Sequence, residues 1–135
     1  MKKILSILFL FLSFFVYSCD DDNRGLGPGD SMKIDKTQAE VDADGGTLTF
    51  KCSNYNWWVS TVDVFENGIK REIGGTGLQF ENDENEWFTI TFPGEDRKTL
   101  QLELKPNPDS AERKLIVCMQ CGNTFGYLNI TQKGK

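Results

Sequence analysis

The stretch TLTFKCSNYNWWVS, residues 47–60, contains the pattern on which the fold prediction rests. In its first half, apolar side chains occupy every second position, at Leu48, Phe50 and Cys52. Successive side chains of a β-strand point to opposite faces, so this period of two places the three apolar groups on one face. The second half brings two adjacent tryptophans, of which one must face inward and the other outward if the strand continues.

The same alternation recurs in four later runs, at residues 88–92, 100–104, 115–119 and 128–132. Turn-forming sequences lie between the runs, namely DADGG at 42–46, PGED at 93–96, KPNPD at 105–109 and CGNT at 121–124. Beyond the N-terminal leader no stretch of the sequence has a helical period. Short strands separated by regular turns predict an all-β protein with an antiparallel β-sandwich.

A β-hairpin is predicted at residues 62–73, because Asn67-Gly68 lies between two strand-like segments. A type I′ turn needs positive φ at both central positions, and Asn-Gly suits it. The acidic sequence ENDENE at 81–86 follows. We interpret residues 62–86 as an inserted hairpin and acidic loop, which is either a tolerated surface insertion or part of a binding surface.

Residues 1–18 are predicted to form a signal peptide. Lys2 and Lys3 precede an apolar run at 4–16, which is shorter than the roughly 20 residues that cross a bilayer. The sequence VYSC at 16–19 resembles the lipobox of bacterial lipoproteins, which implies cleavage before Cys19 and lipidation of this cysteine. The alternative is an ordinary secreted protein that is cleaved at a small residue.

A flexible tether is predicted at residues 19–32, because this segment is rich in glycine and aspartate and has few bulky apolar side chains. The acidic run at 20–22 resembles the signal that directs lipoproteins of Bacteroidetes to the outer face of the cell. The expected location is therefore the outer membrane, with the protein lipid-anchored and exposed at the cell surface. Only the lipid is expected to hold it to the membrane.

The remaining residues, 33–135, have the usual length of one domain. Removal of the leader takes away Lys2 and Lys3 but no acidic residue, so the net charge falls from −5 to near −7. This charge favours solubility and argues against a nucleic-acid partner, whose phosphates require a basic surface.

The sequence offers little for catalysis, because it contains no histidine. Its absence removes the usual general base and the commonest zinc ligand. The carboxylates at 42–44 and 81–86 all lie in predicted turns, whereas a glycosidase needs two acids held across a cleft. We therefore expect no enzyme activity, no cofactor and no metal site.

Four sequences occur in the order of the landmarks of a BACON domain. These are GGTLTFKCSNYNWWVS, EWFTITFPGE, LKPNPDSAERKLIV and YLNITQKGK. The chain resembles this family over residues 33–135, apart from the insert at 62–86. The resemblance implies an immunoglobulin-like sandwich of the kind found in surface lipoproteins and polysaccharide-degrading enzymes of Bacteroidetes. It also implies a link to carbohydrate, which we treat as an expectation.

The aromatic residues are the candidate binding groups. Trp57 shares its face with Val59 and is predicted to lie in the core, while Trp58 shares its face with Ser60 and points outward. Trp58 either packs beneath the inserted hairpin or remains open to a ligand. Trp87 is predicted to be half-buried. The candidate ligand-binding residues are therefore Tyr55, Trp58 and Trp87, with amide groups from Asn54, Asn56 and Asn85 if the loops converge.

Two functions remain open on this basis. The first is a non-catalytic surface module that binds carbohydrate or mucin glycans, and the second is a structural spacer or protein-interaction lipoprotein without glycan binding. The expected partner is therefore a glycan or a surface protein.

Three cysteines remain if Cys19 is lipidated. Cys52 is predicted to be buried, and Cys118 and Cys121 form either a local disulfide or none. Ser31 and Ser110 each lie in a sequence that resembles the Asp-Ser/Thr-apolar motif for O-glycosylation of exported Bacteroidetes proteins. Asn129 fits an N-glycosylation sequon, but it lies in a predicted strand, and we expect it to be unmodified.

Overall fold

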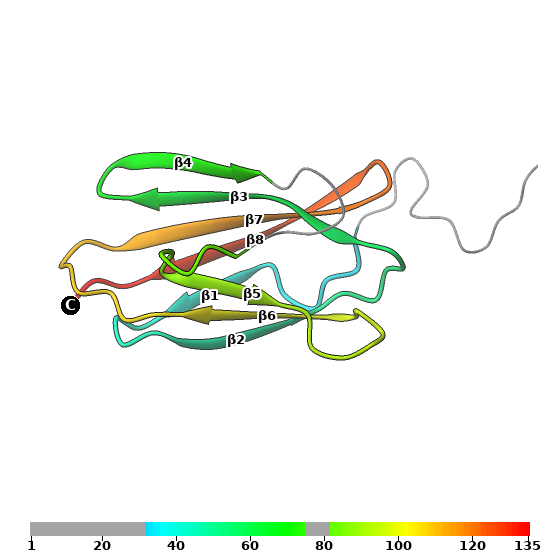
Figure 1. The fold of residues 1–135 in the computed structure, drawn as a ribbon, viewed down its shortest axis with the longest axis horizontal. Helices are drawn as coiled ribbons and strands as arrows, with labels where there is room; N and C mark the ends of the chain where they lie inside the picture. Colours follow the sequence, from blue (N-terminus) through cyan, green and yellow to red (C-terminus); the bar gives the residue numbers. More distant parts are fainter. Residues whose placement is uncertain (1–31, 75–81) are drawn as a thin grey trace, which may run out of the picture.

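A computed structural model describes residues 32–74 and 82–135 of the chain. The described residues form two β-sheets packed face to face, as Figure 1 shows. The larger sheet has the order β1-β8-β7-β3-β4 and the smaller one the order β2-β6-β5. The strands are β1 (Gln38–Val41), β2 (Gly46–Lys51), β3 (Trp58–Glu66), β4 (Ile69–Gly74), β5 (Phe88–Thr91), β6 (Thr99–Leu104), β7 (Arg113–Cys121) and β8 (Thr124–Gln132). The predicted β-sandwich is confirmed.

The core consists of the apolar side chains that the alternation placed on one face of each strand. The smaller sheet contributes Phe50, Phe88, Ile90, Leu100, Leu102 and Leu104. The larger sheet contributes Val59, Val62, Val64, Leu115, Val117, Met119, Leu128 and Ile130. Burial of such side chains is the main favourable term in folding, so the period-two pattern determines the sandwich.

The predicted hairpin is present as β3 and β4, and its turn is formed by Asn67 and Gly68. Their φ angles are 52° and 74°, as a type I′ turn requires. The prediction that both strands of this hairpin are an insertion is wrong for the first one, because β3 lies inside the larger sheet. β3 pairs with β7 as well as with β4, and Val62 and Val64 are fully buried. Only β4, which lies at the edge of the sheet, can be regarded as an added strand.

One strand pair differs from the antiparallel expectation, because β1 runs parallel to β8. The turn after β1 carries the chain from the larger sheet to β2 in the smaller one, so β1 and β2 cannot form a hairpin. β1 instead extends the edge of the larger sheet beside β8, with Gln38 opposite Asn129. The short QAEV sequence gave no alternation long enough to predict this strand.

Met32, which the sequence assigned to the tether, is buried in the core. It lies with Ile34 over Gly126 of β8. A Cβ atom at Gly126 would be 2.7 Å from Ile34 Cδ1 and 3.1 Å from Met32 Sδ. A side chain at this position would therefore require the side chains of Ile34 and Met32 to move, so glycine suits this end of the sandwich.

Of the two alternatives for Cys118 and Cys121, the structure has no disulfide, since Cys52, Cys118 and Cys121 are all free and buried. β7 continues to Cys121, so the two cysteines of the CxxC sequence lie three residues apart in one strand and point to opposite faces. The Cys121 Sγ donates to the Tyr55 carbonyl at 3.1 Å. Burial raises the pKa of the Cys52 and Cys118 thiols, which disfavours the reactive thiolate.

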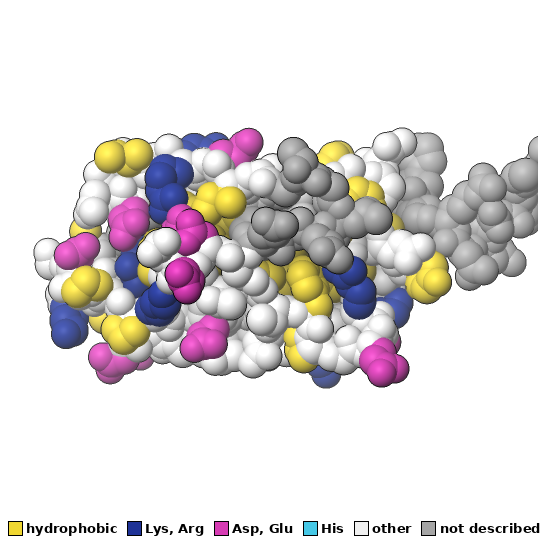
Figure 2. Space-filling model, in the orientation of Figure 1, with side chains coloured by type: hydrophobic (Ala, Val, Ile, Leu, Met, Phe, Trp, Pro, Cys, Tyr) yellow, Lys and Arg dark blue, Asp and Glu magenta, His cyan; other side chains and the backbone are white. Residues whose placement is uncertain are grey.

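Charged side chains of both signs are interspersed on the face shown in Figure 2. Arg71 of β4 makes a bidentate ion pair with Glu86, at 2.7 and 3.0 Å.

Within the described residues no group of three or more Asp, Glu, Cys or His side chains is arranged to hold a metal. That part of the chain also contains no helix long and apolar enough to cross a membrane.

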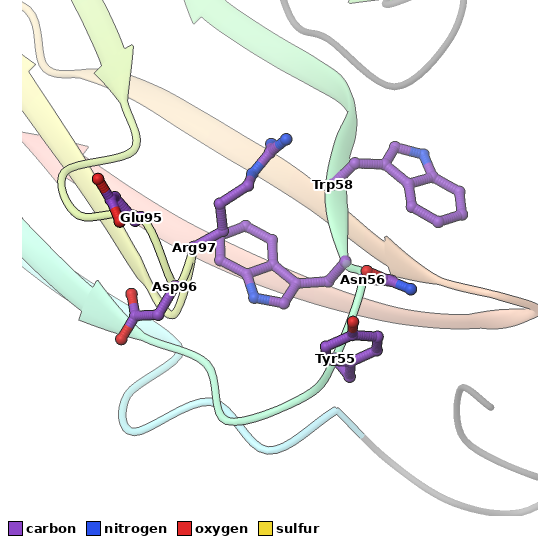
Figure 3. A pocket seen from close by; sticks show the side chains of 7 residues that line it. Tyr55, Asn56, Trp58, Glu95, Asp96 and Arg97 are labelled. Atoms are coloured by element: carbon purple, nitrogen blue, oxygen red, sulfur yellow. The ribbon is translucent and has the colours of Figure 1, made fainter. Parts of the chain in front are cut away.

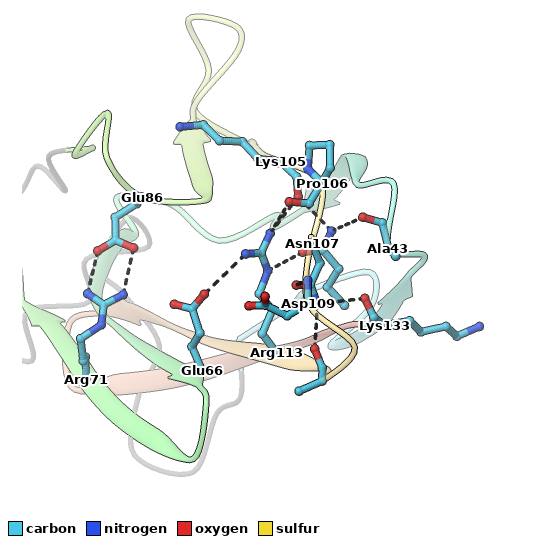
Figure 4. Close-up of polar contacts among 12 residues, drawn as sticks. Ala43, Glu66, Arg71, Glu86, Lys105, Pro106, Asn107, Asp109, Arg113 and Lys133 are labelled. Atoms are coloured by element: carbon cyan, nitrogen blue, oxygen red, sulfur yellow. Dashed lines mark hydrogen bonds and ion pairs between the residues drawn. The ribbon is translucent and has the colours of Figure 1, made fainter. Parts of the chain in front are cut away.

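A buried arginine joins the two sheets at the end of the sandwich where β7 begins and β8 ends (Figure 4). Arg113 of β7 is only 5% exposed, and burial lowers its pKa, although the guanidinium stays charged. Its Nε donates to Gln132 Oε1 at 2.8 Å, and its Nη2 donates to the Lys105 and Pro106 carbonyls at 3.0 Å each. Its Cζ lies 4.1 Å from the centre of the Trp87 ring.

Arg113→Ala should lower the free energy of unfolding by about 2–4 kcal/mol, because it leaves buried acceptors without donors. Lys114→Ala is the matched control, since Lys114 is the next residue, is exposed and pairs with Glu112 at the surface. It should change stability by less than about 0.5 kcal/mol. Urea denaturation measures both, and equal losses would contradict a special role of Arg113.

Candidate functional site

Two loops converge at the end of the sandwich where the described chain begins. β2 and β5 both pair antiparallel with β6, so they run in the same direction and end at the same side. The loops that follow them, at 52–57 and 92–98, are therefore neighbours. β3 begins here, and the β7–β8 turn also lies here (Figure 1). The strand order thus assembles a site from segments distant in sequence.

A pocket of about 540 Å³ lies between the two loops (Figure 3). Its lining combines aromatic rings from the first loop with charged groups from the second. The lining residues are Tyr55, Asn56, Trp57, Trp58, Glu95, Asp96 and Arg97.

The paired tryptophans are separated as the sequence predicted, with Trp57 directed inward and Trp58 outward. Trp57 is 4% exposed and packs against Phe92, with ring centres 5.6 Å apart. Its buried Nε1 has no hydrogen-bond partner among the described residues, which is unfavourable unless a water or a ligand reaches it. Trp58 is half-buried and lies opposite Gln120 of β7, on the outer face of the larger sheet.

Backbone geometry exposes the third ring of the site. Asn56 has a φ of 52°, a left-handed conformation that asparagine tolerates better than most residues. This turn leaves the preceding Tyr55 ring 59% exposed at the rim of the pocket. Lys98 fixes the loop from the opposite side, because its Nζ donates to the Ser53 and Asn54 carbonyls at 2.8 and 3.0 Å.

The charged side of the pocket was missed by the sequence interpretation. Glu95 and Asp96 belong to the PGED turn at 93–96, and Arg97 follows it with a φ of 49°. The Arg97 guanidinium lies 4.9 Å from the centre of the Phe92 ring and makes no ion pair with another described residue. PGED was recognised as a turn, but only the strand order reveals that it lines the same pocket as Tyr55.

Not all of the predicted ligand-binding residues join the pocket. Tyr55, Asn56 and Trp58 do, whereas Asn54 is buried and its Oδ1 accepts bonds from Lys33 N at 2.6 Å and Cys52 Sγ at 3.3 Å. It anchors the N-terminal segment instead. Trp87 is buried at the opposite end against Arg113, so the expected half-buried ring does not reach this site.

The remaining predicted residues lie elsewhere. Asn85 donates from its side chain to Asp83 Oδ1 at 2.9 Å in the acidic loop, away from the pocket lining. Ser110 is exposed in the segment between β6 and β7, and Asn129 lies within β8. Cys19 and Ser31 fall outside the described residues, as do the predicted signal peptide and most of the tether.

Comparison with known proteins gives a similarity to a solved structure but identifies no family. No protein-family model matches the chain, and no curated protein matches it. Among solved structures, the chain is similar to one described as the NMR structure of the protein from Bacteroides thetaiotaomicron. The two share 26% sequence identity with a TM-score of 0.61, over 81% of this chain and 92% of the other. This similarity supports the sandwich and points to a protein of Bacteroidetes type.

Trp57→Ala should cost about 3–5 kcal/mol of stability as a large truncation in the core. Trp58→Ala should cost about 1–2 kcal/mol, because only part of its ring is buried. Urea denaturation of the two variants makes the comparison at adjacent positions. Equal losses would mean that Trp58 is a packing residue and that its ring is not available to a ligand.

Proposed function

We propose that this protein is a non-catalytic surface lipoprotein module, of the BACON-like kind that its sequence resembles, and that its pocket binds carbohydrate. The observation that carries the proposal is the convergence of Tyr55 and Trp58 with polar groups in one pocket. Ligand sites typically combine apolar and aromatic walls with a few placed polar groups. Sugar rings offer an apolar face to an aromatic side chain and hydroxyl groups at their edges, so they suit this lining.

The lining also contains polar groups that accept and donate hydrogen bonds, as recognition of sugar hydroxyl groups requires. Asn56 lies on the same loop as the aromatic residues, and Glu95 and Arg97 lie on the facing loop (Figure 3). Glu95 and Asp96 are adjacent on one turn and do not face each other across the pocket as a glycosidase pair does. The arrangement therefore favours recognition over hydrolysis.

A protein-interaction role is the alternative, and the exposed Ile69 at the start of β4 favours it. This residue lies beside the Asn67-Gly68 turn, at the end of the sandwich opposite the pocket. The two candidate functions thus use different ends of the molecule, which allows them to be tested separately.

The binding test is a glycan array, including mucin glycans, probed with the purified protein. Wild type should bind a defined set of glycans, and Tyr55→Ala and Trp58→Ala should each weaken binding at least tenfold, which is about 1.4 kcal/mol. Ile69→Ala is the control and should bind as wild type does. Absence of glycan binding by wild type would overturn the proposal and leave the protein-interaction alternative.

The proposal includes a lipid anchor at Cys19 that holds the module on the outer membrane. When the protein is produced in a Bacteroides host with an alkyne analogue of palmitate, we expect label on wild type and none on Cys19→Ala. Cys118→Ala, which removes a thiol from the folded domain, should keep the label. An unlabelled wild type, or label that persists without Cys19, would refute the anchor.

A further inference from the structure

The outer face of the larger sheet carries aromatic residues that the sequence interpretation did not single out. Phe125 and Tyr127 of β8 are 47% and 51% exposed. They lie two positions apart and therefore on the same face of the strand, while Leu128 and Ile130 fill the core from the opposite face. The core is thus complete without these two rings.

The strand register connects these residues to the pocket. Phe125 lies opposite Gln120 of β7, and Gln120 lies opposite Trp58 of β3, so the three form one row across the sheet. Trp58 and Phe125 are two strands apart, which corresponds to about 10 Å. Since Trp58 also lines the pocket, the row begins at the rim of the site described above.

The next row repeats the arrangement one step along the strands. Tyr127 lies opposite Cys118, which lies opposite Thr61 of β3. The register of β3 shifts between Val59 and Thr61, as in a β-bulge. Bulges increase local twist and change the direction of neighbouring side chains, and this one separates the row of Trp58 from that of Thr61.

The chemistry of the two rows indicates an uncharged polar ligand. Their members are aromatic, amide, hydroxyl or thiol residues, and none is charged. The Gln120 amide is held in place by a hydrogen bond from Nε2 to the Gly122 carbonyl at 2.9 Å, and its Oε1 has no partner among the described residues. The nearest charge along β3 is Asp63 in the following row, which pairs with Lys70 at 2.9 Å.

We propose that the pocket and the two rows form one continuous site for an extended, uncharged polysaccharide chain. This inference rests on the proposed function and names its ligand class. Trp58 lies at the corner, where a chain held between Tyr55 and Asn56 leaves the pocket. Phe125 and Tyr127 stack further sugar rings on the outer face. The separation between Trp58 and Phe125 allows each ring to stack on a different sugar of one chain. A single terminal sugar could not reach both.

The test compares chain lengths at fixed chemistry. The probes are barley β-glucan, galactomannan and the purified di- and hexasaccharides of each, and the affinities are measured by calorimetry. The double variant Phe125→Ala/Tyr127→Ala should bind the polymer and hexasaccharide at least tenfold more weakly than wild type does. It should bind the disaccharide equally well. Trp58→Ala should weaken binding of every length, and Ile69→Ala should change none.

Each result decides between stated alternatives. If the double variant keeps wild-type affinity for the polymer while Trp58→Ala loses it, the pocket acts alone and this inference is wrong. If wild type binds no probe and no array glycan, the proposed function fails with it. If the protein self-associates in sedimentation experiments and the double variant does not, the rows are a contact between copies and not a glycan surface. Unchanged melting temperatures confirm that the exposed substitutions leave the fold intact.

Discussion

The buried guanidinium of Arg113 is the constraint on which the closed end of the sandwich depends. A charge taken out of water must be matched by acceptors, and here they come from both sheets. Gln132 ends β8 in the larger sheet, while the Lys105 and Pro106 carbonyls follow β6 in the smaller one. Gln132 also donates to Lys105 at 2.9 Å, so the two side chains hold the same carbonyl. Directional bonds of this kind fix the relative position of the sheets, which apolar packing alone constrains less strictly.

The opposite end is closed by different means, and this difference creates the site. Met32, Ile34 and Trp57 fill the space between the sheets there, and polar contacts of Asn54 and Lys98 hold the loop above them. The loop is therefore fixed before any ligand arrives, although it belongs to no strand. A pre-ordered loop loses less conformational entropy on binding, which favours affinity from a small number of contacts.

The sequence predicted what depends on local pattern and missed what depends on strand order. Alternation identified the core-facing residues, and Asn67-Gly68 identified the hairpin, because both signals lie within a few residues. The pairing of β1 with β8 and the convergence of the loops at 52–57 and 92–98 depend on which strands become neighbours, which no local pattern records. Trp87 was misjudged for a related reason, since its burial comes from Arg113 on another strand. The alternation around Phe125 and Tyr127 can be read from the sequence. Only the strand register shows that these two residues share a face of the sheet with Trp58.

The position of the two ends of the described chain has a consequence for orientation. Met32 enters the fold beside the pocket, whereas Lys135 lies at the other end, where its amide donates to the Asp109 carbonyl at 2.9 Å (Figure 1). An anchor attached upstream of Met32 would join the domain at its aromatic end, and the C-terminal end would lie farther from the point of attachment. Such a module would bind polymer chains that lie close to the envelope. A domain fused after Lys135 would lie at the other end and would not obstruct the binding site.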